Sequence, residues 1–132
     1  MAITQQSGRQ CSAWATVDFA YTDLTSGTAA AAIKLPIGAV VVGGAVVVKT
    51  AFNSGTSDVI VVGDATTANR YLTSTSIASA ARTALVPTGY LTLSATREIK
   101  VTWTGVGTAP SAGAARLEVE YIVPGRAEFS QD

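Results

Sequence analysis

The sequence predicts an all-β domain, an antiparallel β-sandwich of jelly-roll type with about seven or eight strands. Short segments that alternate apolar and polar residues recur along the chain, and turn residues separate them. No segment shows the long apolar periodicity of an amphipathic helix. The chain has 132 residues, which is the length of one domain and is enough to bury a core unaided.

The first predicted strand spans residues 13–21, where apolar residues alternate with polar ones. This pattern is typical of a strand with one buried face. It follows residues 1–12, a polar stretch without periodicity that we expect to form a flexible arm. Trp14 lies on the face opposite Val17, so it is the aromatic residue that is most readily placed at a contact.

Four consecutive alanines follow a predicted loop at residues 22–28, and they could begin a helix on propensity alone. Gly27 before them and Pro36 after them leave little room for a helix. We therefore predict a short strand at residues 31–35, followed by a turn at residues 35–39.

The most distinctive stretch is residues 40–52, which is rich in valine and has Gly43 and Gly44 near its middle. β-Branched residues favour extended chain, and the glycine pair predicts a bulge or bend. Both faces of this strand are apolar. We expect the outward face of its central part, the valine ribbon at residues 40–48, to be covered by another segment or another subunit.

After a hairpin loop at residues 53–57, a second apolar strand is predicted at residues 58–62. Residues 65–89 are less regular. A short strand could lie at residues 70–72, and residues 77–85 fit either a helical turn or two or a loop that ends in a short strand.

The strand pattern returns at residues 90–95 and, after a tight turn, at residues 98–104, where we expect Trp103 to point inward. A glycine-rich loop at residues 105–113 leads to the last predicted strand, residues 114–123. In this strand Arg116, Glu118 and Glu120 alternate with apolar residues, so one face is predicted to be buried.

We therefore predict an arm at residues 1–12, a β-sandwich domain at residues 13–124 and a flexible polar tail at residues 125–132. The tail contains Arg126 and Phe129. A phenylalanine in a polar tail is explained if it docks on something, either its own domain or a neighbour.

The sequence contains no histidine. This removes the usual general acid or base and the commonest metal ligand, so Ser-His-Asp and Cys-His sites cannot be built. Most zinc, copper and non-haem iron sites also lose their ligands. We therefore predict that the protein is not an enzyme and that it has no catalytic residue, no cofactor and no metal ion.

Two pairs of carboxylates deserve comment because such pairs can hydrolyse glycosides or bind calcium. No loop here presents several oxygens as an EF-hand does, so we expect both pairs to be solvated or bridged across the sheet. The pairs are Asp58 with Asp64 and Glu118 with Glu120, and the expected partners are Lys100 and Arg116.

Nine basic and nine acidic residues cancel, and the basic ones are scattered singly, so we predict no direct contact with nucleic acid. Charged residues make up 14% of the chain, against about 25% in an ordinary soluble domain. We interpret this low charge as surface that partners cover. The longest near-apolar run, residues 37–48, is too short to span a bilayer, and no signal peptide is visible, so no membrane is expected. The single cysteine, Cys11, excludes an intrachain disulfide.

Several segments between residues 30 and 127 share turn-and-strand patterns with a known group of proteins. They are LPIGA at 35–39, TAFNSGTSD at 50–58, VGD at 62–64, NRY at 69–71, PTGY at 87–90 and YIVPGRA at 121–127. These segments resemble small structural proteins of tailed bacteriophages, above all capsid cement or decoration proteins.

The resemblance implies a protein that binds the outside of an assembled capsid, bridges neighbouring capsid subunits and stabilises the head. Its partners would be the major capsid protein and copies of itself, as a dimer or trimer, in a virion assembled in the host cytoplasm. We place the interface at Arg9, Trp14, Arg126 and Phe129. A tail, baseplate or fibre component is an alternative, and a carbohydrate-binding module that uses aromatic residues such as Trp14 and Tyr71 is another.

Overall fold

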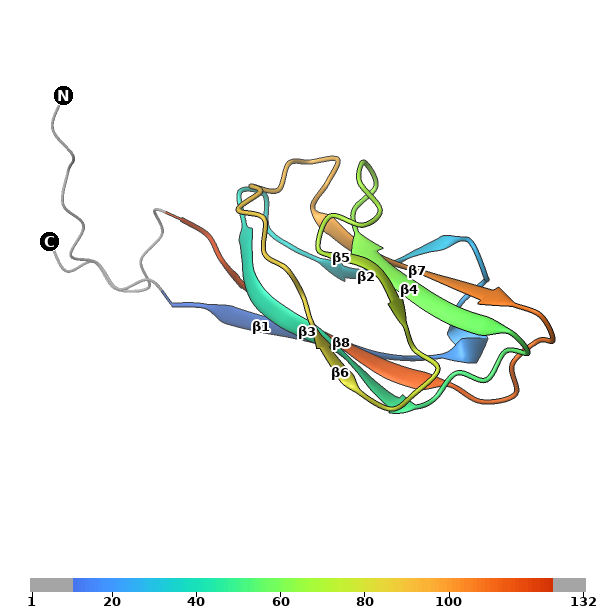
Figure 1. The fold of residues 1–132 in the computed structure, drawn as a ribbon. Helices are drawn as coiled ribbons and strands as arrows, with labels where there is room; N and C mark the ends of the chain where they lie inside the picture. Colours follow the sequence, from blue (N-terminus) through green and yellow to red (C-terminus); the bar gives the residue numbers. More distant parts are fainter. Residues whose placement is uncertain (1–10, 125–132) are drawn as a thin grey trace, which may run out of the picture.

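Two four-stranded antiparallel sheets pack face to face in the computed structural model, which describes residues 11–124 (Figure 1). The predicted all-β sandwich is confirmed. The strands are β1 (Ala13–Ala20), β2 (Ala29–Lys34), β3 (Val40–Thr50), β4 (Ser57–Gly63), β5 (Leu72–Ser76), β6 (Arg82–Ala84), β7 (Glu98–Val106) and β8 (Ala114–Ile122). A short 3-10 helix, η1 (Tyr21–Asp23), follows β1.

The strand order is that of a jelly roll. One sheet has the order β1-β8-β3-β6 and the other has the order β2-β7-β4-β5. The first strand pairs with the last, the second with the seventh, the third with the sixth and the fourth with the fifth. This is the pairing of one long hairpin that has been rolled up, and the β3·β8 and β4·β7 pairs then complete the two sheets.

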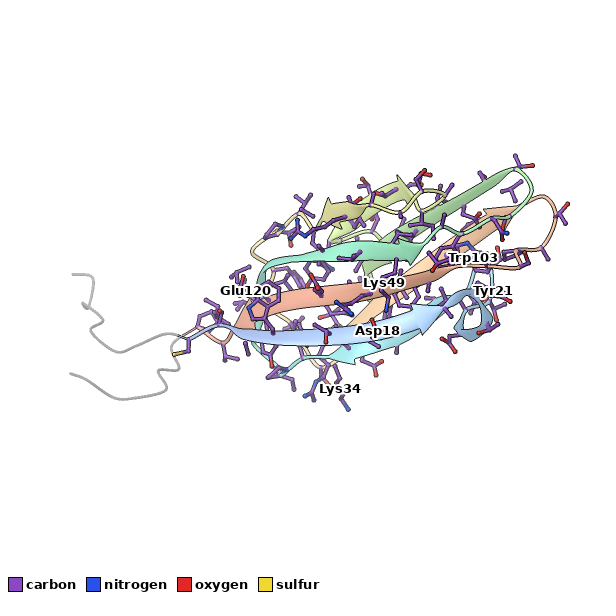
Figure 2. All side chains as sticks on the ribbon, turned by 90° about the horizontal axis from the view of Figure 1, so that it is seen from below. Asp18, Tyr21, Lys34, Lys49, Trp103 and Glu120 are labelled. Carbon is purple, nitrogen blue, oxygen red and sulfur yellow. The ribbon has the colours of Figure 1, made fainter. Side chains whose placement is uncertain are left out.

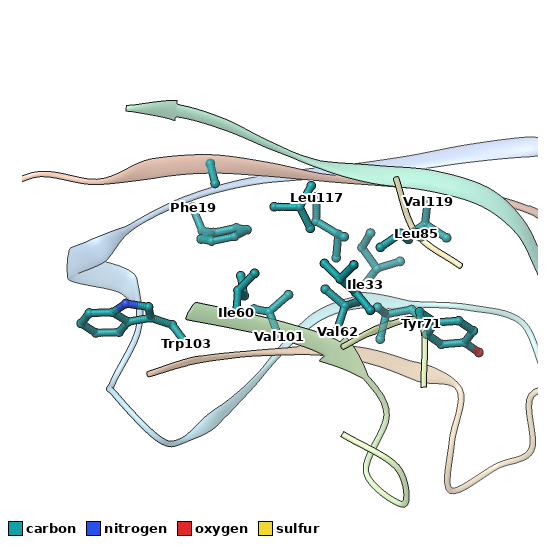
Figure 3. Close-up of a cluster of buried hydrophobic side chains, with 14 of the residues drawn as sticks. Phe19, Ile33, Ile60, Val62, Tyr71, Leu85, Val101, Trp103, Leu117 and Val119 are labelled. Atoms are coloured by element: carbon teal, nitrogen blue, oxygen red, sulfur yellow. The ribbon is translucent and has the colours of Figure 1, made fainter. Parts of the chain in front are cut away.

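The core lies between the sheets and is built from every second residue of the strands, the ones whose side chains point inward. On β8, Leu117 and Val119 are buried, and Leu117 points toward Ile60 and Val101 of the opposite sheet (Figure 3). Trp103 is also buried, as its place in the alternating pattern predicts. Buried residues alternate with more exposed ones along most of β7 and β8, so the remaining side chains of these strands point outward.

The glycine pair of β3 forms the predicted bulge. The register with β8 shifts between Val41 and Gly43. Gly44 has a φ of +136°, and a Cβ atom there would lie 2.2 Å from the carbonyl oxygen of Glu118. Past the bulge, outward Ala45 of the valine ribbon is fully buried within the chain itself, so this part of the ribbon needs no external cover.

The strand expected at residues 90–95 is absent, and that prediction is wrong. Leu91 makes one isolated bridge with Val40. Beside it, Thr92 donates its backbone N–H to the carbonyl oxygen of Ala39 and accepts from the backbone N–H of Gly38. Thr92 Oγ1 donates to the carbonyl oxygen of Pro36 and accepts from the backbone N–H of Ala39. Thr92 is therefore bonded to the turn through both its backbone and its side chain, and the pairing does not continue as a ladder.

Of the two possibilities for residues 77–85, the loop with a short strand at its end is confirmed, because β6 begins at Arg82. The possible strand at residues 70–72 is displaced along the chain, since β5 begins at Leu72. Arg70 instead pairs with Asp64 in the β4–β5 loop. No helix within residues 11–124 is long and apolar enough to cross a membrane.

Candidate docking surface

The outer face of the sheet β1-β8-β3-β6 has a charged half (Figure 2). Asp18 of β1 accepts hydrogen bonds from Lys49 Nζ at 3.1 Å and from Arg116 Nε at 3.0 Å. The hydrogen bond from Lys49, followed by that from Arg116, lowers the pKa of Asp18 below its ordinary value. Three neighbouring strands thus contribute to one solvent-exposed ion-pair network.

Beyond Glu118 and Glu120 of β8, apolar side chains lie at the other end of the same face. Val40 pairs with Ile122 of β8 on one side and bridges to Leu91 on the other. Paired residues of antiparallel strands project to the same face, and the buried neighbours of Val40, which are Ala39 and Val41, show that this face is the outer one. A row of three apolar side chains therefore crosses the sheet.

Further exposed apolar residues surround this row. Gly38 N–H donates to the carbonyl oxygen of Thr92, which holds the β2–β3 turn against the segment that carries Leu91 and Leu93. Trp14 faces Glu120, which in turn faces the bulge beside Val42, so Trp14 lies about 10 Å from the bulge, two strand spacings away. We define the apolar end patch as Trp14, Ile37, Val40, Val42, Leu91, Leu93 and Ile122.

Most members of the patch are well exposed. Five of its members, Trp14, Ile37, Val42, Leu91 and Leu93, are at least 40% exposed. Both described ends of the chain leave from this end of the sandwich, because Ala13 pairs with Tyr121 (Figure 1).

Among the predicted interface residues, only Trp14 can be placed. It is 57% exposed on β1, on the face opposite Val17. Arg9, Arg126 and Phe129 lie outside the described residues, as do most of the predicted arm and tail. The sequence analysis missed the other patch members. The alternation of Leu91 and Leu93 is a visible signal, but by itself it predicts a strand.

The expected partners of Asp58 and Asp64 are wrong, because both carboxylates are buried and each holds a turn. Asp58 accepts from Ser54 N–H, Ser54 Oγ and Trp103 Nε1. Asp64 accepts from Arg70 Nε and from the backbone N–H groups of two threonines, Thr66 and Thr67. Their partners are neighbouring loop residues and, for Asp58, the indole of Trp103 on β7, and neither Lys100 nor Arg116 is among them.

The second carboxylate pair lies on the sheet face. Glu118 Oε2 lies 3.8 Å from Arg116 Nη1, and Glu120 accepts a 2.7 Å hydrogen bond from Ser12 Oγ. Residues 11–124 contain no group of three or more metal-ligating side chains. Tyr71 is buried in the core, so it does not share a surface with Trp14 as a sugar-binding platform would require.

No family model and no curated protein matches this sequence. Among solved structures, a chain of the cyanophage Pam1 capsid asymmetric unit matches 94% of this chain and 92% of its own length, at 20% identity and a TM-score of 0.72. A chain of the acid-stable capsid of Helicobacter pylori bacteriophage KHP30 matches 86% of this chain and 89% of its own length, at 21% identity and a TM-score of 0.64. A chain of the Ralstonia phage GP4 capsid matches 95% of this chain and 91% of its own length, at 13% identity and a TM-score of 0.57. At these identities the likeness shows a shared fold.

Proposed function

We propose that this chain is a structural virion protein of a tailed bacteriophage that binds the outer capsid surface and bridges neighbouring capsid subunits. The observation that carries the proposal is the shared fold, which extends over at least 86% of this chain in three structures of phage capsids. The sequence resemblance to cement and decoration proteins supports the same role. The partners are then the major capsid protein and further copies of this chain, as a dimer or trimer.

The apolar end patch is the surface that we assign to this binding. Contiguous exposed apolar surface on a small soluble protein is usually a binding site, and an exposed tryptophan is a common energetic anchor of interfaces. Trp14 supplies such an anchor at one side of the patch, and the exposed Leu91 and Leu93 lie at the other side, beyond β3. Many copies on one repeating lattice hold tightly even when each contact is modest.

The experiment uses phage particles that lack this protein, to which purified full-length chain is added back. Leu93→Asn or Trp14→Ser is expected to abolish both binding to the particle and protection against heat-induced loss of DNA. Val106→Thr is the matched control, because Val106 is similarly exposed at the far end of β7. It is expected to bind and protect like the wild-type chain.

Two outcomes contradict this proposal. The capsid role fails if particles with and without the chain lose DNA at the same temperature, or if labelled chain is found only on the tail. The assignment of the surface fails separately, if the wild-type chain protects particles and Leu93→Asn protects them equally well.

A further inference from the structure

One long side of the sandwich is open within residues 11–124. β1 pairs only with β8, and β2 pairs only with β7, so each leaves one edge without a strand partner. These two edge strands belong to different sheets and lie on the same side of the sandwich. We call the gap between them the β1–β2 seam. An unpaired strand edge can accept a further strand through its free N–H and C=O groups.

A cavity of about 180 Å³ opens into this seam. Its lining is mostly apolar and comes from β1, the following loop, β2 and β7. The apolar lining residues are Val17, Phe19, Leu24, Ala30, Ala32 and Val101, and Asp18, Asp23 and Ala31 complete the lining. The cavity exists because β2 is built from alanines, whose small side chains leave this space unfilled. An engineered apolar cavity of about 150 Å³ binds benzene, so this one is the size of a single phenyl ring.

We propose that the β1–β2 seam receives residues 125–132 from a second copy of this chain, with the ring of Phe129 in the cavity. A strand that adds to the edge of β2 directs alternate side chains between the two sheets, where the cavity lies. Main-chain hydrogen bonds to β2 and one buried ring then hold the segment. This inference does not depend on the capsid role proposed above.

The sequence of the segment fits the seam. Phe129 is the only large apolar residue among residues 125–132. Arg126 lies three residues earlier, which is about 10 Å in an extended chain. A second hollow continues from the cavity along β2, and its lining includes the paired residues Lys34 and Glu98. A segment antiparallel to β2 therefore brings its arginine level with this charged pair, where Glu98 offers a carboxylate, when its phenylalanine fills the cavity.

The reach of the chain favours a second copy over the same copy. Ala13 pairs with Tyr121, so Ser12 is level with Ile122, and the chain runs outward beyond the end of β8 (Figure 1). The first lining residue on β1, Val17, lies five residues back along the strand, about 17 Å. Five residues from Pro124 to position 129 span at most about 18 Å, which leaves nothing for reversing direction and crossing β1.

The test is cross-linking of full-length chains in which Cys11→Ser removes the native thiol. One chain carries Ala31→Cys at the seam, and the other carries Ser130→Cys beside the phenylalanine. With a short bis-maleimide cross-linker, we expect a covalent dimer of one Ala31→Cys chain and one Ser130→Cys chain, at several protein concentrations. Adding Phe129→Ala to the second chain is expected to lower its yield about tenfold, as the loss of an aromatic anchor does.

The matched control places the first cysteine at Thr73→Cys, which is exposed on β5 at the opposite edge of the same sheet. It is expected to give little mixed dimer. Equal yields from the two edges, or a yield that does not change with Phe129→Ala, overturn the proposal. A chain that carries both Ala31→Cys and Ser130→Cys and cross-links within itself at high dilution overturns the assignment to a second copy.

Discussion

The indole Nε1 of Trp103 donates a 2.8 Å hydrogen bond to Oδ1 of Asp58, and both residues are buried. The same carboxylate accepts from the backbone N–H and the hydroxyl of Ser54, at 2.8 and 2.6 Å. Asp58 therefore ties the loop before β4 to the middle of β7. A buried carboxylate with three donors is a structural acceptor, since burial without them would be costly.

Replacing Asp58 with alanine is expected to lower the free energy of unfolding by roughly 2–4 kcal/mol, because buried N–H donors lose their acceptor. Urea denaturation of both proteins measures this difference. Glu120→Ala is the control, because Glu120 is partly exposed and accepts one hydrogen bond, from Ser12 at the surface. Equal losses of unfolding free energy in Asp58→Ala and Glu120→Ala would show that the buried hydrogen bonds stabilise the fold no more than the surface one.

Gly44 in the bulge of β3 can be compared with Gly27, which lies in the loop before β2. Both have positive φ, +80° at Gly27 and +136° at Gly44. A Cβ atom at Gly27 meets nothing within 4 Å, whereas at Gly44 it would meet the backbone of β8. We expect Gly27→Ala to cost about 1 kcal/mol and Gly44→Ala more than about 3 kcal/mol, measured by thermal or urea unfolding. Similar costs would mean that the bulge relaxes easily.

Most of the fold follows from local patterns in the sequence. β1, β3, β4, β7 and β8 were predicted because side-chain alternation and β-branched runs are properties of neighbouring residues. The segment at residues 90–95 has the same local alternation, yet its conformation is set by Thr92, which bonds to a turn more than fifty residues away. Periodicity carries no information about such a partner.

The candidate docking surface was predicted only in part for a related reason. Trp14 could be assigned to the outer face from its position in an alternating strand. Ile37 and Leu93 join it only because a turn and a loop, distant in sequence, are hydrogen-bonded together. The sequence therefore identifies single exposed residues, while the patch is a property of the topology.

The ion pairs of Asp18 give a prediction on pH. Its pKa is lowered, first by the hydrogen bond from Lys49 and then by that from Arg116. Because the folded-state pKa is below the unfolded one, the stabilisation is present above the ordinary pKa and is lost as pH falls through the lowered one. Lys49→Met is expected to raise the pKa of Asp18 in an NMR titration of its carboxyl group. Lys34→Met, on β2, serves as the control and should leave it unchanged.

Tyr71 gives a prediction at the other end of the pH scale. Its hydroxyl is buried without a hydrogen-bond partner among residues 11–124, and burial raises its pKa above the ordinary value. A raised folded-state pKa means that stability is kept below about pH 10 and is lost as pH rises beyond it, because the unfolded chain ionises first. Tyr71→Phe is expected to raise neutral-pH stability by up to about 1 kcal/mol and to reduce the alkaline loss. Urea unfolding of both proteins at neutral pH and above about pH 10 measures these differences. A large loss of stability of Tyr71→Phe at neutral pH would contradict the prediction.

The two tryptophans provide a direct reading of the apolar end patch. Trp14 is 57% exposed in the free chain, and Trp103 is 5% exposed. Iodide should therefore quench only the Trp14 part of the fluorescence, and Trp14→Phe should remove the quenchable part. If the capsid covers the patch, particle-bound chain should lose this quenching while the emission of Trp103 is unchanged. Trp14 that stays quenchable on the particle would mean that another face of the sandwich meets the capsid, since a buried anchor excludes the quencher together with water.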